Sequence, residues 1–250
     1  MRDKNYLVTG ATGGIGRRVC LKLAEHQTKL ILAARPTARL ESVVSDLRGL
    51  KGVSECVPIP LDFENTRTVE LANRQVAELG MSIDGLVLVY PSIPKSPEII
   101  PAAAEWQEAL NRCFVNPLFL LRGCLDSMAD GSRIVIVSGI ASVQVFPDLA
   151  YSNAIRAAWL AEAKLLAFRL GQRQIRVNTL SLGGTLTERF TERLASAGNP
   201  ASEDHPDRIA LGHYGNPEDV ADVVVSLLGN LSNHITGANI VCDGGLTKSY

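Results

Sequence analysis

Residues 6–16 read YLVTGATGGIG, and this stretch decides the fold of the chain. The apolar run at 6–8 is typical of a buried parallel strand, and the residues from about 14 to 26 follow a helical pattern. Glycine is needed between a strand and a helix where the backbone turns tightly and approaches a pyrophosphate, which the positive end of the helix attracts. The position of the turn predicts a dinucleotide site rather than a glycine-rich turn that binds nothing. The predicted contacts are Gly10, Thr12, Gly14, Ile15 and Gly16.

The length and composition are those of one large α/β domain. The chain has 250 residues, of which 46% are hydrophobic and 20% charged, so a single domain over 1–250 is able to bury a full core. The formal net charge of -1 provides no basic field for nucleic acid or for an anionic membrane. No apolar run approaches the roughly 20 residues of a membrane helix. We therefore expect a small-molecule partner.

The cysteines indicate a reducing compartment. They form no Cys-x-x-Cys pair and have no adjacent histidine cluster, which favours buried thiols in a cytoplasmic protein over disulfides and predicts no metal site. The first predicted strand begins within a few residues of Met1, which leaves no room for a signal peptide. The five cysteines are Cys20, Cys56, Cys113, Cys124 and Cys242.

Strand-like and helix-like patterns alternate along the whole chain. This alternation predicts a Rossmann-type, doubly wound parallel sheet of about seven strands with helices on both faces. The stretch from Thr185 to Tyr214 is predicted to be irregular and follows a strand, so we interpret it as a substrate lid, the alternative being a surface insertion. The predicted strands are 6–8, 30–33, 57–61, 86–89, 134–137, 176–180 and 239–241. The predicted helices after the first begin near 37 and cover 64–79, 103–128, 152–170 and 217–228.

The residues after the second and third strands bear on the choice of cofactor. Ala34 offers no carboxylate for the ribose 2′-hydroxyl of NAD, whereas Arg35 is able to pair with a 2′-phosphate. This favours NADPH, with NADH as the alternative if Arg35 is only a solvated surface residue. Asp62 follows the third strand and is predicted to accept a hydrogen bond from the adenine amino group, or else to cap the next helix.

Several motifs together resemble the classical short-chain dehydrogenase/reductase family. They are the glycine turn, Asp62, the RVN run at 176–178, the PEDVA run at 217–221, and the ITG and DGG runs at 235–237 and 243–245. The resemblance covers the whole chain and implies a nicotinamide cofactor and a homotetramer or homodimer. It also implies that Thr187 contacts a phosphate and that the backbone at Val89 lies beside the nicotinamide.

The catalytic tetrad of this family, Asn, Ser, Tyr and Lys, is altered here. Counting back from Asn178 by the family's usual spacing places Ser152 at the Tyr position and Arg156 at the Lys position. The same register places Gly139 at the Ser position and Cys113 at the Asn position. A slip of one residue would restore a pair of Ser138 and Tyr151, but it would not restore the lysine. The candidate catalytic residues are therefore Ser152, Arg156, Tyr151 and Ser138.

The altered tetrad favours conjugate reduction over ketone reduction. Without the lysine, a tyrosine near its ordinary pKa of about 10 is a poor proton shuttle at neutral pH, and arginine stays protonated. Hydride addition to an enone or dienone gives a delocalised enolate, which needs electrostatic stabilisation more than a strong acid. Arg156 and Arg189 are predicted to supply this stabilisation, and Tyr90 is predicted to contact the substrate.

The pattern is similar to a subgroup of the family, the reductases of bacilysin and aeruginosin biosynthesis. The resemblance lies in Gly139, in the Ser152 and Arg156 pair, in the TERF run at 187–190 and in the chain ending. It implies hydride delivery to a dihydro-4-hydroxyphenylpyruvate in specialised-metabolite synthesis. Two alternatives stay open: a carbonyl reductase such as a 3-oxoacyl reductase that uses Ser138 and Tyr151, and a non-catalytic scaffold.

Overall fold

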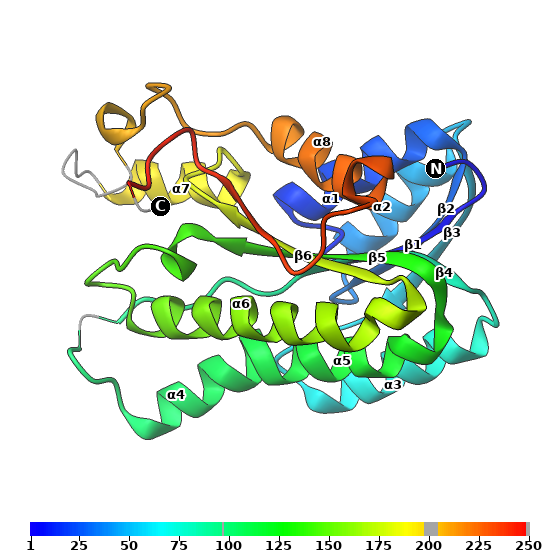
Figure 1. Ribbon diagram of the computed structural model, residues 1–250, viewed down its shortest axis with the longest axis horizontal. Coiled ribbons are helices and arrows are strands. Elements are labelled where there is room, and N and C mark those ends of the chain that lie inside the picture. The colour runs from blue at the N-terminus through cyan, green and yellow to red at the C-terminus, as the bar shows by residue number, and fades with distance from the viewer. Residues whose placement is uncertain (97, 198–204, 249–250) are drawn as a thin grey trace.

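The computed structural model describes residues 1–96, 98–197 and 205–248. Within these residues, seven parallel strands form one sheet in the order β3-β2-β1-β4-β5-β6-β7 (Figure 1). The Rossmann-type doubly wound sheet that the sequence predicts is therefore confirmed. The strands are β1 (Asn5–Thr9), β2 (Thr28–Ala34), β3 (Val53–Pro60), β4 (Ile83–Val89), β5 (Met128–Gly139), β6 (Arg176–Leu182) and β7 (Asn239–Cys242).

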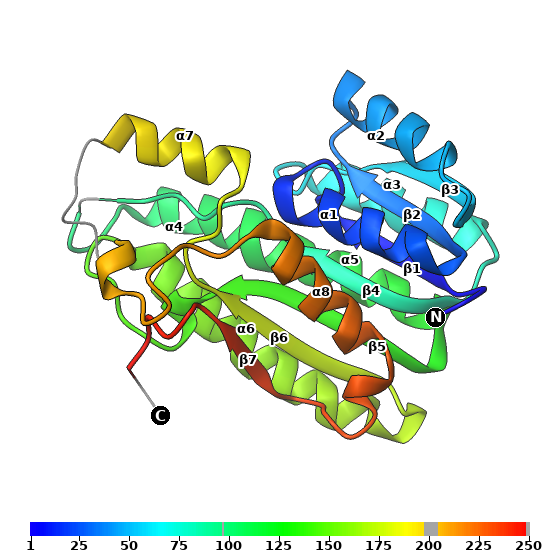
Figure 2. The ribbon, with the colours of Figure 1, turned by 90° about the horizontal axis from the view of Figure 1, so that it is seen from above.

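Helices cover both faces of the sheet, as Figures 1 and 2 show. One face carries α1 (Gly14–Leu23), α2 (Ala38–Arg48) and α8 (Pro217–Leu228). The other carries α3 (Thr66–Glu78), α4 (Ala103–Leu110), α5 (Asn116–Cys124) and α6 (Ala150–Leu170). Side chains alternate across β1, so Leu7 joins the core on the α6 face while Tyr6 and Val8 join the core on the α1 face. Burial on both faces explains why the strands are continuous apolar runs.

The span predicted for the helix at 103–128 is wrong. A π-helical turn at Asn111–Val115 separates α4 from α5, a 3-10 turn follows at Leu125–Ser127, and Met128 already belongs to β5. The interruption has a local cause, because Pro117 has no N–H to offer to the carbonyl of Cys113 four residues earlier. The indole Nε1–H of Trp159 on α6 donates to that carbonyl instead, at 2.9 Å.

The stretch at 185–214 is not irregular throughout. It contains α7 (Glu188–Ala197) and a 3-10 turn at Pro206–Arg208, and the glycine-proline segment around 198–200 lies outside the described residues. The helix places Arg189, Phe190 and Leu194 on the wall of a cleft that is described below.

The RVN and ITG runs hold the last two strands together. Asn178 on β6 donates from Nδ2 to the carbonyl of Ile235 at 2.9 Å and accepts from the N–H of Ala238 at 3.1 Å. The hydroxyl of Thr236 accepts from the N–H of Val177 at 3.1 Å. These hydrogen bonds join β6 to the segment that leads into β7, so the two runs have a structural role.

The five cysteines are free thiols, four of them buried and Cys242 half-buried. Burial raises the pKa of the Cys56 thiol to about 11 and that of Cys124 to about 12. None of the helices in the described ranges has the length and hydropathy that crossing a bilayer demands.

Candidate active site

A cleft of about 910 Å³ opens beyond the carboxyl ends of the strands. Its walls come from the start of α1, the segment after β4, the end of β5, the start of α6, the segment after β6 and helix α7. The sheet order reverses direction between β1 and β4, and open α/β sheets bind ligands outside the strand ends at such a point. The cleft therefore stands where the topology predicts a ligand.

The glycine turn after β1 is built for close approach. Gly10 has φ 60°, in the left-handed region that glycine adopts without strain. A Cβ on Gly16 would stand 2.3 Å from the carbonyl oxygen of Gly10, so only glycine lets α1 begin this close to the turn. The N-cap residue of α1 is Gly13, which has no side chain to accept a hydrogen bond from the first N–H groups of the helix. These N–H groups are therefore open to a ligand. This cradle fits the diphosphate of a dinucleotide.

Two further contacts join the turn to neighbouring segments. Thr9 hydrogen-bonds through Oγ1 to both the N–H and the carbonyl of Val89, at 2.8 and 2.9 Å, and so ties the ends of β1 and β4 together. A Cβ on Gly14 would stand 2.7 Å from the side chain of Thr187, which lies just before α7. Thr187 therefore lies beside the turn, as expected for a phosphate contact.

The residues that the sequence predicts to contact the adenosine end of the cofactor lie just beyond the ends of β2 and β3. Arg35 is exposed at the end of β2. Arg39, the second residue of α2, pairs with Glu188 at the start of α7, with Nη2 and Oε2 2.6 Å apart, and this pairing lowers the pKa of Glu188. The Asp62 carboxylate accepts from the N–H of Glu64 at 3.0 Å, while the α3 N-cap is Asn65. Asp62 thus shapes a turn and does not cap the helix.

Arg156 and Ser152 lie together on the wall of the cleft. They are four residues apart on α6, and therefore on one face of the helix. The Nε–H of Arg156 donates to Oγ of Ser152 at 2.7 Å. The guanidinium lies against Gly139, where a Cβ would stand 1.8 Å from Nη1. The absence of a side chain at Gly139 is what makes room for the arginine.

Tyr151 lies outside this cleft. Its ring is buried against Trp106, edge to face at 4.8 Å, and its hydroxyl donates to Oε2 of Glu105 on α4 at 3.3 Å. Burial, followed by the charge of Glu105, raises the pKa of Tyr151. The structure does not bring Tyr151 and Ser138 together as a pair.

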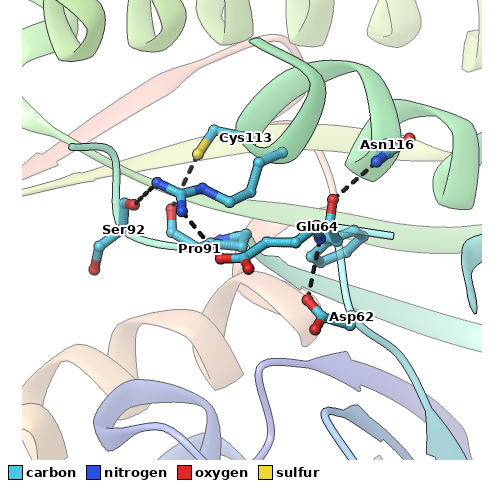
Figure 3. A network of polar contacts seen from close by, with 8 residues as sticks. Asp62, Glu64, Pro91, Ser92, Cys113 and Asn116 are labelled. Atoms are coloured by element: carbon cyan, nitrogen blue, oxygen red, sulfur yellow. Dashed lines mark hydrogen bonds and ion pairs between the residues drawn. The ribbon is translucent and has the colours of Figure 1, made fainter. Parts of the chain in front are cut away.

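Cys113 is fully buried, and its surroundings are closed by protein atoms. Its carbonyl accepts from Trp159, as described above, and its Sγ donates to the carbonyl of Pro91 at 3.6 Å. Nearby, Arg112 binds Oε1 of Glu64 at 3.0 Å and the carbonyl of Ser92 at 3.3 Å (Figure 3). This network fixes the segment after β4 that leads into the cleft.

Tyr90 was predicted to contact the substrate, but the structure directs its hydroxyl elsewhere. Its Oη lies 3.0 Å from Oγ of Ser138, and its ring stacks on Trp159 with centroids 5.7 Å apart. Ser138 lines the cleft and Tyr90 stands behind it. The sequence does not reveal this pair, because the two residues are neighbours only through the parallel pairing of β4 with β5.

The cleft carries more positive than negative side chains. Lys95, Arg156, Arg189 and Arg193 line it, against the single carboxylate of Asp148 among its described lining residues. Lys95 and Arg193 were also missed from the sequence. Their positive charge becomes apparent only when the segment after β4 and helix α7 are placed opposite α6.

The chain is similar to known proteins over nearly its whole length. The family described as "Enoyl-(Acyl carrier protein) reductase" matches residues 10–247. The 3-oxoacyl-[acyl-carrier-protein] reductase FabG of Thermotoga maritima is 29% identical, with 98% of each chain covered. The 1-cyclohexenylcarbonyl-CoA reductase of Streptomyces collinus is 27% identical over 98% of this chain and 88% of its own.

The fold also matches solved structures. YwfH, an NADPH dependent reductase involved in bacilysin biosynthesis, superposes with a TM-score of 0.91 and 20% identity, over 99% of this chain and all of that one. On the match that spans nearly its whole length, the chain belongs to the short-chain dehydrogenase/reductase family of NAD(P)H-dependent oxidoreductases.

Proposed function

We propose that this protein is an NADPH-dependent reductase that adds hydride to a conjugated C=C bond of an anionic small molecule. The observation that carries the proposal is the arginine at the tetrad's Lys position, which fills the space left by Gly139 and is hydrogen-bonded to Ser152. An arginine and a serine provide positive charge and a hydrogen bond, but no acid close to neutral pH.

Conjugate reduction suits these groups. When bound, the nicotinamide cofactor supplies the hydride. As the far carbon of an enone is reduced, negative charge collects on the carbonyl oxygen, and a fixed guanidinium in a partly enclosed cleft stabilises this charge. Arg156 performs that role, and Ser152 holds its Nε–H end in place.

The substrate is proposed to carry a carboxylate. Lys95 and Arg189 stand in the cleft besides Arg156, so one cation is able to stabilise the enolate while another holds a carboxylate. A dihydro-4-hydroxyphenylpyruvate of specialised-metabolite synthesis satisfies both demands. One relative supports the reaction class, since it is named as a reductase of a cyclohexenylcarbonyl thioester.

The segment at 185–214 is proposed to act as the substrate lid. Three observations on its described part support this role: Thr187 lies against the glycine turn, Arg189 faces the cleft, and Glu188 is paired with Arg39 across the cofactor end. Closure of α7 over the cleft would exclude water from the developing charge.

The proposed assembly is a homotetramer or homodimer located in the cytoplasm. Phe168 on α6 is 86% exposed, and Leu165 and Val241 are also exposed, so α6 and β7 offer apolar surface for a second copy. The near-zero net charge supports a protein that does not bind nucleic acid.

Replacing Arg35 with alanine is expected to raise KM for NADPH roughly 10- to 100-fold and to leave KM for NADH unchanged. The reason is the loss of a charge-assisted hydrogen bond to the 2′-phosphate, worth about 1.5–3 kcal/mol. Steady-state kinetics with each cofactor measures the effect. The exposed Arg122 on α5 is the matched control, and Arg122→Ala should leave both values unchanged. Equal KM changes for both cofactors would remove Arg35 from this role.

A second function is favoured by one comparison. The similarity to FabG fits a 3-oxoacyl reductase, for which Tyr151 and Ser138 would be the acid pair. The position of Tyr151 against Glu105 supports conjugate reduction instead.

The deciding experiment follows NADPH oxidation at 340 nm with two substrates side by side, a 3-oxoacyl thioester and dihydro-4-hydroxyphenylpyruvate. We expect turnover of the dienone alone. Tyr151→Phe should change kcat less than about threefold, because the hydroxyl lies outside the cleft, whereas loss of a general acid costs about 10²–10⁴-fold. Turnover of the ketone, abolished by Tyr151→Phe, would replace the proposal by the carbonyl reductase.

A further inference from the structure

A pair of hydroxyl groups at the wall of the cleft has no place in the altered tetrad. Oη of Tyr90 and Oγ of Ser138 hydrogen-bond at 3.0 Å, and both residues are buried, at 8% and 6% exposure. Ser138 is the second-last residue of β5, directly before Gly139, and it lines the cleft. Tyr90 follows β4 and stands behind Ser138. The pair therefore reaches from the protein interior to the cleft.

The pair is held rigidly. The Tyr90 ring stacks on Trp159, and Trp159 is in turn anchored through Nε1 on the Cys113 carbonyl. Trp159 belongs to α6, the helix that also carries Arg156. Because strand β5 fixes Ser138 and Trp159 fixes the Tyr90 ring, little entropy is lost when the two hydroxyl groups align for proton transfer.

Two neighbours of Tyr90 partly offset the effect of burial on its phenol. Burial raises the pKa of Tyr90, so the phenol is protonated at neutral pH, while the positive charge of Arg156 and the Ser138 hydrogen bond act in the opposite direction. A phenol is nevertheless a stronger acid than the aliphatic hydroxyl of serine. Ser138 therefore gives up its proton more easily when Tyr90 donates a proton to it than it would alone.

We propose that Ser138 delivers the proton that completes the reduction and that Tyr90 restores it. The enolate oxygen of the substrate forms an O–H bond with the proton of Ser138 Oγ, whose O–H bond breaks, and the enol so formed tautomerises to the ketone after release. Ser138 Oγ then takes the proton of Tyr90 Oη. The resulting phenolate is stabilised by the charge of Arg156, and it regains a proton from water in the cleft through Ser138 Oγ before the next turnover. Ser138 is the group that touches the substrate, and Tyr90 acts through it.

The inference rests on the proposed conjugate reduction, and the test separates the two. If the wild-type protein does not reduce the dienone, the proposed function has failed. If the wild type does, Tyr90→Phe is expected to lower kcat about 10- to 100-fold with KM within twofold. Ser138→Ala should lower kcat at least as much, and Ser138→Thr, which keeps the hydroxyl, should restore most of it. An unchanged kcat in Tyr90→Phe would overturn the relay.

The matched control is Tyr6→Phe. Tyr6 is also buried, on β1 away from the cleft, and burial raises its pKa to about 12. This variant should keep the wild-type kcat. A fall in kcat equal to that of Tyr90→Phe would assign both effects to lost packing and overturn the relay.

A readout without turnover uses 3-fluorotyrosine at position 90, followed by ¹⁹F NMR in the cofactor-free protein. Fluorination makes the phenol more acidic, and Ser138→Ala should raise the midpoint of its titration because a bond to the phenolate is lost. The alkaline limb of the kcat profile should shift with the NMR midpoint. An NMR midpoint that ignores Ser138→Ala, or an alkaline limb that stays in place, would overturn the proposal.

Discussion

Gly139→Ala is expected to lower kcat/KM about 100-fold or more, because the added methyl carbon would stand 1.8 Å from Nη1 of Arg156. The guanidinium would have to leave the place from which we propose that it stabilises the reacting oxygen. Removal of one fixed electrostatic stabiliser costs about 10²–10³ in kcat. Steady-state kinetics on the dienone would measure the effect, with the thermal midpoint as a check on folding.

Two controls make this result specific. Gly171 has no neighbouring atom within 4 Å of an added Cβ, so Gly171→Ala should leave the kinetics unchanged. In an Arg156→Ala background, Gly139→Ala should have little further effect, because the group that it displaces is gone. Additive losses in the double variant would contradict the proposed contact between Gly139 and Arg156.

The second large effect is expected at the glycine turn. In Gly16→Ala the new Cβ would stand 2.3 Å from the carbonyl oxygen and 2.8 Å from the carbonyl carbon of Gly10, both of them backbone atoms. Neither α1 nor the turn is able to move without losing its alignment with the phosphate. We expect NADPH binding, followed by its fluorescence, to weaken more than 100-fold, and overpacking to destabilise the fold by about 1–3 kcal/mol.

Gly171→Ala again serves as the matched substitution, because its φ of -58° is compatible with alanine. It should leave binding unchanged, and a glycine-to-alanine change at a compatible position stabilises by about 0.4–1 kcal/mol. If Gly16→Ala bound NADPH like the wild type, the turn would not be the phosphate cradle.

Some parts of the candidate site could be predicted from the sequence, and others could not. The glycine turn was predictable, because a left-handed Gly10 and a close Gly16 are local requirements written in the sequence. The register that places Ser152 and Arg156 on one face of α6 was also predictable, since it depends only on helical spacing. The choice between Ser152 and Tyr151 was left open, and the packing of Tyr151 against Trp106 and Glu105 places Tyr151 outside the cleft.

Breaks in regular structure were harder to predict. The apolar pattern at 103–128 continues through the π-turn, because a lost backbone hydrogen bond changes no side-chain periodicity. The carbonyl freed by Pro117 finds its partner, Trp159, on a helix far along the chain. Helix α7 was missed for the opposite reason, since the predicted lid was defined by its glycine and proline residues and not by its helical pattern.

The sequence by itself determined the alternation of strands and helices, the place of the dinucleotide turn and the family, because each depends on local pattern or on short spacing. Only the tertiary structure decided which hydroxyl groups meet at the cleft. Tyr90 and Ser138 are 48 residues apart in the chain, and they are neighbours solely because β4 and β5 run side by side. Contacts of this range depend on strand order, which residue pattern does not specify.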